Sequence, residues 1–340
     1  MRLAARAGIR PLRFGYLLDF RNPAAWPRRW EEIYAESLEF ICWCETLGFE
    51  IAWLPEHHCT EDGFLAAPLM IAAAVAARTK KLRISTGVAL APFYHPLRLA
   101  EDMAALDVLS MGRAELAVGV GYLRSETDAF GIDFKSRGRR TDELLEVVRR
   151  LWGGETVTFR GEFFNLEEAR ISPLPVQKPH IPILIGGLSR PGIRRAARYG
   201  SGFIGALDNY SAYREELNAV GRAGAPARFD LVSDMWLLVA DDPEAAFEET
   251  APYYHYQIST YAKWHAESDW DMQPMDFEAF KKSGAVRVLT PEAAIEFLRG
   301  RLDAAPTMES FCMTVPPGLP LPTFAKYAEL FAKKVIPAFR

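Results

Sequence analysis

The chain has 340 residues, of which 49% are hydrophobic, so it can fill a large core as one α/β barrel or as two smaller domains. Its net charge of -4 provides no broad basic field, which argues against nucleic acid as a partner. No apolar stretch approaches the roughly 20 residues that a membrane span needs, and the N-terminus is too weakly apolar for a signal peptide. The spacing of Cys42, Cys44, Cys59 and Cys312 fits neither a zinc ribbon nor a disulfide framework, so reduced thiols in a cytoplasmic protein are expected.

Short apolar runs alternate with helical patterns along the chain. The expected strands are 12–17, 51–54, 82–90, 114–118, 182–185, 203–206, 230–240 and 308–315. The expected helices are 29–48, 68–79, one that follows Pro96 and is ended by Gly112, one that begins near 141, one that ends near 200, and 324–335, with a small hairpin at 156–166.

Eight strands separated by short connections predict a closed parallel (β/α)8 barrel, formed by a single domain over residues 1–340. An open doubly wound sheet is the alternative. Such a sheet usually carries a glycine-rich dinucleotide fingerprint after its first strand, and residues 16–20 lack these glycines. The barrel is therefore favoured.

One segment interrupts the alternation between the seventh and eighth strands. Residues 252–282, within an insertion of approximately 250–290, are rich in aromatic side chains and show no regular pattern. Connections of this length are usually functional or disordered, and the aromatic content argues against disorder. The segment is expected to cover the mouth of the barrel as a lid or substrate wall, with subunit contact or plain packing as the alternative.

Ionisable side chains cluster at the tip of the second strand, where Glu56, His57 and His58 follow the apolar run 51–54. The carboxyl ends of strands are where α/β proteins place their chemistry, and a histidine can move protons near neutral pH. Glu56 could orient either histidine or cap the following helix, and His58 could simply bond to the backbone. Adjacent residues rarely converge on one ion and no His-x-x-x-His spacing is present, so no metal site is expected.

Three stretches in this order carry a resemblance: 53–58, 86–121, and 185–189 followed by 196–200. Together they resemble the bacterial luciferase-like superfamily of flavin-dependent monooxygenases. The resemblance implies a luciferase-like TIM barrel that binds FMN at the C-terminal mouth, or a 5-deazaflavin in one branch of the family. In the family's monooxygenases a separate reductase supplies the reduced FMN, and O2 then oxidises a small organic substrate. Many relatives pair through helices near the start of the barrel, which implies a homodimer.

The resemblance also implies roles for particular residues. His57 matches the acid/base histidine of the luciferase catalytic subunit, and Glu56 and His58 complete the expected catalytic group. A non-proline cis peptide or a bulge is expected where the third strand ends, and a phosphate-binding turn where the fifth strand meets its helix. The expected cofactor-binding residues are Thr86, Gly87, Val88, Gly119, Gly121, Gly186, Gly187, Leu188 and Ser189.

The chain also departs from luciferase. Gly119 and Val120 stand where the catalytic subunit has a cysteine and an arginine, so Arg124 or Arg190 would have to replace that arginine at the phosphate. This departure argues against light emission and against a long-chain aldehyde as substrate. The aromatic insertion suggests an apolar substrate instead. A deazaflavin-dependent dehydrogenase or reductase on the same barrel, and a non-catalytic flavoprotein subunit, are the alternative functions.

Overall fold

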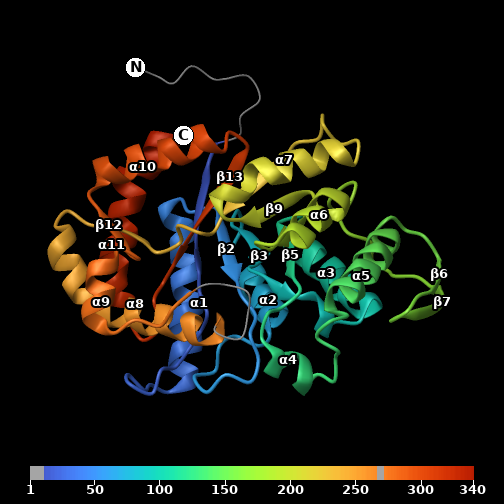
Figure 1. Ribbon diagram of the computed structural model, residues 1–340, viewed down its shortest axis with the longest axis horizontal. Helices are drawn as coiled ribbons and strands as arrows, with labels where there is room; N and C mark the ends of the chain where they lie inside the picture. Colours follow the sequence, from blue (N-terminus) through green and yellow to red (C-terminus); the bar gives the residue numbers. More distant parts are fainter. Residues whose placement is uncertain (1–10, 266–271) are drawn as a thin grey trace.

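The computed structural model describes residues 11–265 and 272–340, and these form a closed parallel barrel ringed by helices (Figure 1). The strands follow the order β3-β2-β1-β13-β10-β9-β8-β5, and a pairing between β3 and β5 closes the ring. The eight barrel strands are β1 Arg13–Leu17, β2 Ile51–Leu54, β3 Arg83–Thr86, β5 Ala114–Gly119, β8 Ile183–Gly186, β9 Gly202–Gly205, β10 Arg228–Leu231 and β13 Met308–Thr314. The predicted barrel is therefore confirmed.

Helices cover the outside of the barrel, and the main hydrophobic core lies between the two layers. Proline in the first turn begins α2, α3 and α6, and Gly48 ends α1 with a left-handed φ of 95°. The helices packed around the barrel are α1 Trp30–Leu47, α2 Pro68–Arg78, α3 Pro96–Leu109, α5 Arg137–Trp152, α6 Arg190–Tyr199, α7 Tyr210–Ala219, α10 Pro291–Ala304 and α11 Leu321–Lys334. None of the helices in the described part of the chain combines the length and the apolar character that crossing a membrane would need.

The interior of the barrel is filled by alternate side chains of the strands. Two small apolar clusters occupy it: the first contains Leu17, Ile51, Trp53 and Cys312, and the second contains Ala117, Leu184 and Ile204. A layer of buried ion pairs centred on Glu115 lies at the amino ends of the strands. The interior is thus a packed core, and room for chemistry lies at one end of it.

Two predicted strands needed correction. The third predicted strand is divided into β3 and β4 (Ala89–Leu90) by the cis peptide bond between Gly87 and Val88. The seventh, at 230–240, is wrong as a single strand, since β11 (Leu237–Val239) leaves the barrel and pairs with β12 (Arg287–Leu289). The polar Asp234 separates the two halves, and its carboxylate pairs with Arg301 at 2.7 Å. The helix expected near 141 begins at Arg137.

The irregular segment expected at 252–282 is also wrong. Most of it belongs to two helices, α8 (Pro243–His265) and α9 (Phe277–Ser283), and residues 266–271 lie outside the described residues. In α8 the buried residues Tyr254, Ile258 and Ala262 recur every four positions, which is the period of a helix face. Figure 1 shows α8 running across one end of the barrel.

Shorter elements complete the chain. The hairpin predicted at 156–166 is confirmed, although its second strand extends further than expected. A short helix at the carboxyl end of the barrel, α4, was not predicted and contributes to the candidate site. These elements are η1 Ala91–Phe93, α4 Arg124–Ala129, β6 Val157–Arg160, β7 Asn165–Ala169, η2 Leu207–Asn209 and η3 Ile336–Phe339.

Candidate active site

The barrel topology brings the predicted site residues to one rim. The strands β2, β3, β5 and β8 are successive neighbours around the barrel and run parallel, so their carboxyl ends open on the same side. His57 follows β2, Gly87 follows β3, Gly119 ends β5 and Gly186 ends β8. Residues far apart in the sequence therefore lie around one rim of the barrel.

Val88 links three of these strand ends. A Cβ added to Gly119 would lie 2.8 Å from Val88 Cγ2, and one added to Gly186 would lie 2.8 Å from Val88 Cγ1. A Cβ on Gly87 would lie 2.7 Å from Cβ of Trp53 on β2. The Gly87–Val88 peptide bond is cis, as the resemblance implied. Glycine is therefore required at these positions by close packing across the mouth.

His57 is held by a carboxylate that sequence reasoning missed. Its Nδ1 lies 2.9 Å from Oε1 of the fully buried Glu126 on α4, and its Nε2 lies 3.2 Å from the hydroxyl of Tyr122. A carboxylate that accepts from Nδ1–H leaves Nε2 as the basic nitrogen. Phe64 and Trp264 each place a ring 4.8 Å from the imidazole, so His57 is shielded from water on two sides.

His58 and Glu56 form a second pair. His58 Nε2 lies 2.9 Å from Glu56 Oε1, and the backbone N–H of His58 donates to Glu126 at 2.8 Å. Glu56 also accepts from the Leu90 N–H at 2.7 Å and from the Tyr94 hydroxyl at 3.0 Å. Glu56 thus orients His58 and ties the strand tip to the neighbouring loop. It does not cap the following helix, and the His58 ring bonds to a carboxylate rather than to the backbone.

The remaining predicted residues at the rim have mainly structural contacts. The Thr86 hydroxyl donates to the Ala117 carbonyl at 2.6 Å and accepts from the Ala117 N–H at 2.8 Å, which joins β3 to β5. Gly121 has a positive φ of 74°, and its carbonyl accepts from Arg137 Nε at 3.1 Å. These contacts hold the loop that leads from β5 to Tyr122 and Glu126.

The turn from Gly186 to Ser189 has the features of an anion cradle. Ser189 precedes α6 with extended backbone angles, and its hydroxyl makes no capping hydrogen bond. The first N–H groups of a helix have no partner within it, and they lie at the positive end of its dipole. A Cβ on Gly187 would lie 3.6 Å from Gly192 Cα, so the turn packs closely on α6. The Gly187 N–H already donates to the Ile204 carbonyl at 3.2 Å. The N–H groups of Leu188 and Ser189 and the Ser189 hydroxyl are therefore the donors of this turn that would fit the phosphate of a flavin nucleotide.

The two arginines considered as replacements for the luciferase arginine already have partners. Arg124 places its guanidinium carbon 4.6 Å from the ring centre of Phe134. Arg190 Nη1 lies 3.3 Å from Glu216 Oε1 on α7, and its side chain is 59% exposed. Neither contact involves the turn at 186–189, so backbone N–H groups and Ser189 remain the cradle's identified donors.

Helix α8 closes the mouth over His57. Besides Trp264, it contributes His265, whose ring stacks on Tyr122 with centroids 4.2 Å apart. Burial, together with the nearby His57, lowers the pKa of His265 to about 4, so this imidazole is neutral at physiological pH. Burial raises the pKa of Tyr122 well above its usual range, so its hydroxyl stays protonated and can donate to His57.

Several of these residues could have been found from the sequence by one signal. Tyr122 and Glu126 come soon after the glycine-ended strand β5, Tyr122 in the loop and Glu126 on the short helix α4, and residues that follow a barrel strand lie at its mouth. Trp264 and His265 carried no comparable signal, because their helix was not recognised. Among the residues that the structure describes, no group of three His, Cys, Asp or Glu side chains is placed to hold a metal ion.

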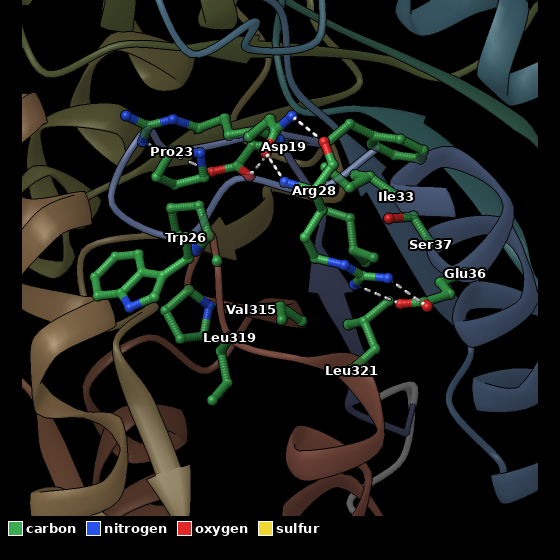
Figure 2. Close-up of a pocket in the computed structure, with 17 residues that line it drawn as sticks. Asp19, Pro23, Trp26, Arg28, Ile33, Glu36, Ser37, Val315, Leu319 and Leu321 are labelled. Atoms are coloured by element: carbon green, nitrogen blue, oxygen red, sulfur yellow. Dashed lines mark hydrogen bonds and ion pairs between the residues drawn. The ribbon is translucent and has the colours of Figure 1, made fainter. Parts of the chain in front are cut away.

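A pocket that opens to solvent lies beside this rim (Figure 2). The loops that follow β1 and β13 form it together with α1, and Trp26, Pro23 and Leu319 contribute to its wall. Arg28 crosses it to make two hydrogen bonds with Glu36, at 2.7 and 2.6 Å. None of the residues predicted from the sequence lines it, but Asp19 and Arg21, which follow β1, do, so this outer pocket borders the mouth.

Known proteins resemble this chain in both sequence and structure. Residues 12–298 match the family described as luciferase-like monooxygenase. A 4-hydroxyprotoasukamycin monooxygenase from Streptomyces nodosus subsp. asukaensis is 36% identical over 167 residues, covering 48% of this chain and 45% of that protein. An F420-dependent glucose-6-phosphate dehydrogenase from Kineococcus radiotolerans is 33% identical over 230 residues, covering 62% and 66%. The structure of monooxygenase RslO1 from Streptomyces bottropensis aligns with a TM-score of 0.82 and 25% identity, covering 97% of this chain and 100% of that one.

The matched segment thus spans less than half the length of the first relative. The relatives include a monooxygenase and a dehydrogenase, and both are oxidoreductases. Because the family match covers most of the sequence, this chain belongs to the luciferase-like monooxygenase family and is built on that family's barrel.

Proposed function

We propose that this protein is a flavin-dependent monooxygenase that takes reduced FMN from a separate reductase and uses O2 to oxidise a small organic substrate. The observation that carries the proposal is the buried His57–Glu126 pair, which lies at the same rim as the glycine-serine turn. Reduced flavin, when bound, supplies the electrons that activate O2 for transfer of one oxygen atom. The protein must supply binding, proton transfer and protection from water.

In this proposal His57 moves the proton. Glu126 holds Nδ1, so Nε2 can accept a proton from a reacting hydroxyl group or water and return it later. Tyr122 lies 3.2 Å from the same nitrogen and can carry the proton one step further. Phe64 and Trp264 would exclude water from His57, which limits side reactions at the site. Glu126 is a positioning residue, and Glu56 and His58 support the same strand tip.

The cofactor would be held by the side of the mouth that the ends of β3, β5 and β8 form. The turn of Gly187, Leu188 and Ser189 would bind its phosphate, and the strand ends joined by Val88 would face its ring. The residues proposed to line this face are Thr86, Gly87, Val88, Gly119, Gly121 and Gly186.

Replacing one glycine of this face tests the cofactor assignment. A Cβ on Gly186 would lie 2.8 Å from Val88 Cγ1, so Gly186→Ala must displace the side chain that joins the strand ends. We expect affinity for FMN to fall about tenfold, because overpacking of this kind costs about 1–3 kcal/mol. Gly300→Ala on α10 is the matched control, since its Cβ would meet no atom within 4 Å. Flavin fluorescence titration gives both affinities, and equal affinities would refute the assignment.

Oxygen dependence separates the two catalytic alternatives. A monooxygenase should form product from reduced FMN only with O2, with one O2 consumed per product after the O2 lost to uncoupled oxidation has been measured as H2O2 and subtracted. A deazaflavin-dependent dehydrogenase would instead transfer a hydride to or from its coenzyme under strict anaerobiosis. Similarity to an F420-dependent dehydrogenase supports the deazaflavin-dependent dehydrogenase as the alternative function. Turnover with reduced F420 or its oxidised form in the absence of O2 would establish the dehydrogenase.

The remaining alternative function is a non-catalytic flavoprotein subunit. A non-catalytic subunit has no need of a buried acid/base pair, so the His57–Glu126 contact favours an active enzyme.

The proposed homodimer would pair through helices near the start of the barrel. The exposed apolar side chains of Met70 on α2 and Leu109 on α3, which are 74% and 49% exposed, support that surface.

A further inference from the structure

A buried arginine beside the candidate site has an unused donor. Arg21 follows β1 at the mouth, and its side chain has no exposed surface. Its Nε donates to Asp62 Oδ2 at 2.6 Å, and its Nη2 lies 2.6 Å from the same oxygen. Its Nη1 lies 3.9 Å from Asp19 Oδ2, too far for a hydrogen bond. Within residues 11–265 and 272–340, Nη1 has no hydrogen-bond partner.

The same guanidinium shares its surroundings with His57. Three aromatic rings enclose it, with centroids 5.5 Å away for Phe64, 5.1 Å for Tyr256 and 5.4 Å for Trp264. Two of these rings, Phe64 and Trp264, also lie 4.8 Å from the His57 ring. Arg21 and the proposed acid/base residue therefore share two aromatic walls of one site.

The neighbouring carboxylates do not depend on Arg21 alone. Tyr256 on α8 donates to Asp62 at 2.7 Å, and Gln257 donates to Asp19 at 3.4 Å. Each carboxylate therefore has a donor from α8, while Nη1 of Arg21 has no acceptor. A buried N–H without an acceptor loses its hydration and gains nothing in return, so a ligand oxygen that reached it would be bound strongly.

The local charge decides which oxygen fits. Two carboxylates, Asp19 and Asp62, surround one guanidinium. Burial, with a smaller contribution from Asp62 that the nearby Arg21 opposes, raises the pKa of Asp19 to about 6, so this group is largely ionised at pH 7. The cluster is then negative by about one charge and would repel a ligand carboxylate. A neutral carbonyl oxygen can accept from Nη1 without this repulsion.

We propose that Arg21 is a specificity-determining residue whose Nη1 binds the neutral carbonyl oxygen of a ring-containing organic substrate. The ring would be held by the aromatic side chains that Arg21 and His57 share, which places the carbonyl compound next to the proposed acid/base residue. This inference deepens the proposed function and rests on it, since it names the substrate class of the same site.

Binding of two matched probes tests the role of Arg21 without any turnover. The probes 1-tetralone and tetralin share one aromatic bicyclic skeleton and differ by the carbonyl oxygen. Calorimetric titration of the full chain, with and without oxidised FMN, should show the ketone binding about tenfold or more tightly than the hydrocarbon. In Arg21→Met this preference should disappear, while affinity for tetralin stays within about twofold.

Further variants guard against misfolding and test the charge argument. Arg21→Met leaves Asp62 without its cation, so the double variant Arg21→Met/Asp62→Asn removes both charges and should also lose the preference. Asp62→Asn alone keeps the guanidinium and should raise affinity for the carboxylate 1,2,3,4-tetrahydro-1-naphthoate several-fold relative to the ketone. Unfolding temperatures confirm that each variant is folded.

Two results would overturn the proposal: a wild type that shows no preference for the ketone, including one that binds neither probe, or an Arg21→Met protein that keeps the preference. Failure of the proposed function would look different. A protein that prefers the ketone through Arg21 but never couples O2 to product would retain this binding role and lose the monooxygenase assignment.

Discussion

Replacing His57 by alanine should lower turnover by about 10²-fold or more while affinity for FMN stays within a few-fold. The imidazole is the side chain of this rim that combines a fixed tautomer with a basic nitrogen held against a hydroxyl donor. Its loss removes proton transfer but leaves the glycine-serine turn intact. Turnover measured with saturating reduced flavin, together with a flavin titration, separates the two effects.

Two further variants give this experiment its controls. His58→Ala should cost less than about tenfold, because the His58 ring pairs with Glu56 and not with the reacting side of His57. Glu126→Gln keeps the shape of the positioning residue but not its charge, so it should shift the pH dependence of turnover as well as lower it. Unchanged turnover in His57→Ala would reject the assigned role.

The second large effect is expected on stability, at the opposite end of the barrel. Glu115 is completely buried and accepts from Arg228 at 2.7 Å and from Arg83, with Arg13 3.6 Å away. Asp230 also pairs with Arg228, at 2.6 Å. Glu115→Gln removes the carboxylate that the three guanidinium groups share and leaves the buried Arg228 with Asp230 as its close partner. We expect the free energy of unfolding to fall by about 3–5 kcal/mol, measured by urea denaturation.

The effect of Glu115 should depend on pH with a defined sign. Burial alone would raise the pKa of Glu115, but Arg228, Arg83 and Arg13 outweigh it and hold the pKa well below its usual range. The folded state therefore keeps this carboxylate ionised where the unfolded chain, with a pKa of about 4.3, is protonated. Its stabilisation is fully present above that value, and as the pH falls further it declines by up to about 1.4 kcal/mol per pH unit.

Glu309 provides the matched control for this cluster. It pairs with Arg13 at 3.1 Å, but its side chain is 17% exposed whereas that of Glu115 is 0% exposed. Glu309→Gln should cost less than about 1 kcal/mol, since partly solvated pairs contribute little. Equal losses for the two variants would show that Glu115 is not the centre of the network.

Much of the barrel could be predicted because its signals are local. Strands such as β2 and β8 are short apolar runs, and proline or glycine marks the helix boundaries next to them. The break at Asp234 was missed because the apolar residues on both of its sides read as one strand. Helix α8 was missed because its many aromatic residues hid a four-residue period.

In the candidate site, likewise, some positions could be predicted from the sequence and others could not. Its strand-tip positions follow from topology once a barrel is assumed, and this is why His57 and the turn at 186–189 could be placed at one rim. The partners of His57 could not be read in this way. Glu126 lies 69 residues further along the chain, on a short helix, and Trp264 belongs to the insertion. Tertiary contacts of this kind depend on how the loops fold over the barrel.

A structure of the protein with bound flavin tests the central claim most directly. We predict that the phosphate contacts the backbone at Gly187–Ser189 and that the isoalloxazine ring lies over Val88, with His57 on the same side of the mouth. Density for the flavin at the outer pocket beside Trp26, or a ring that faces away from His57, would contradict the account.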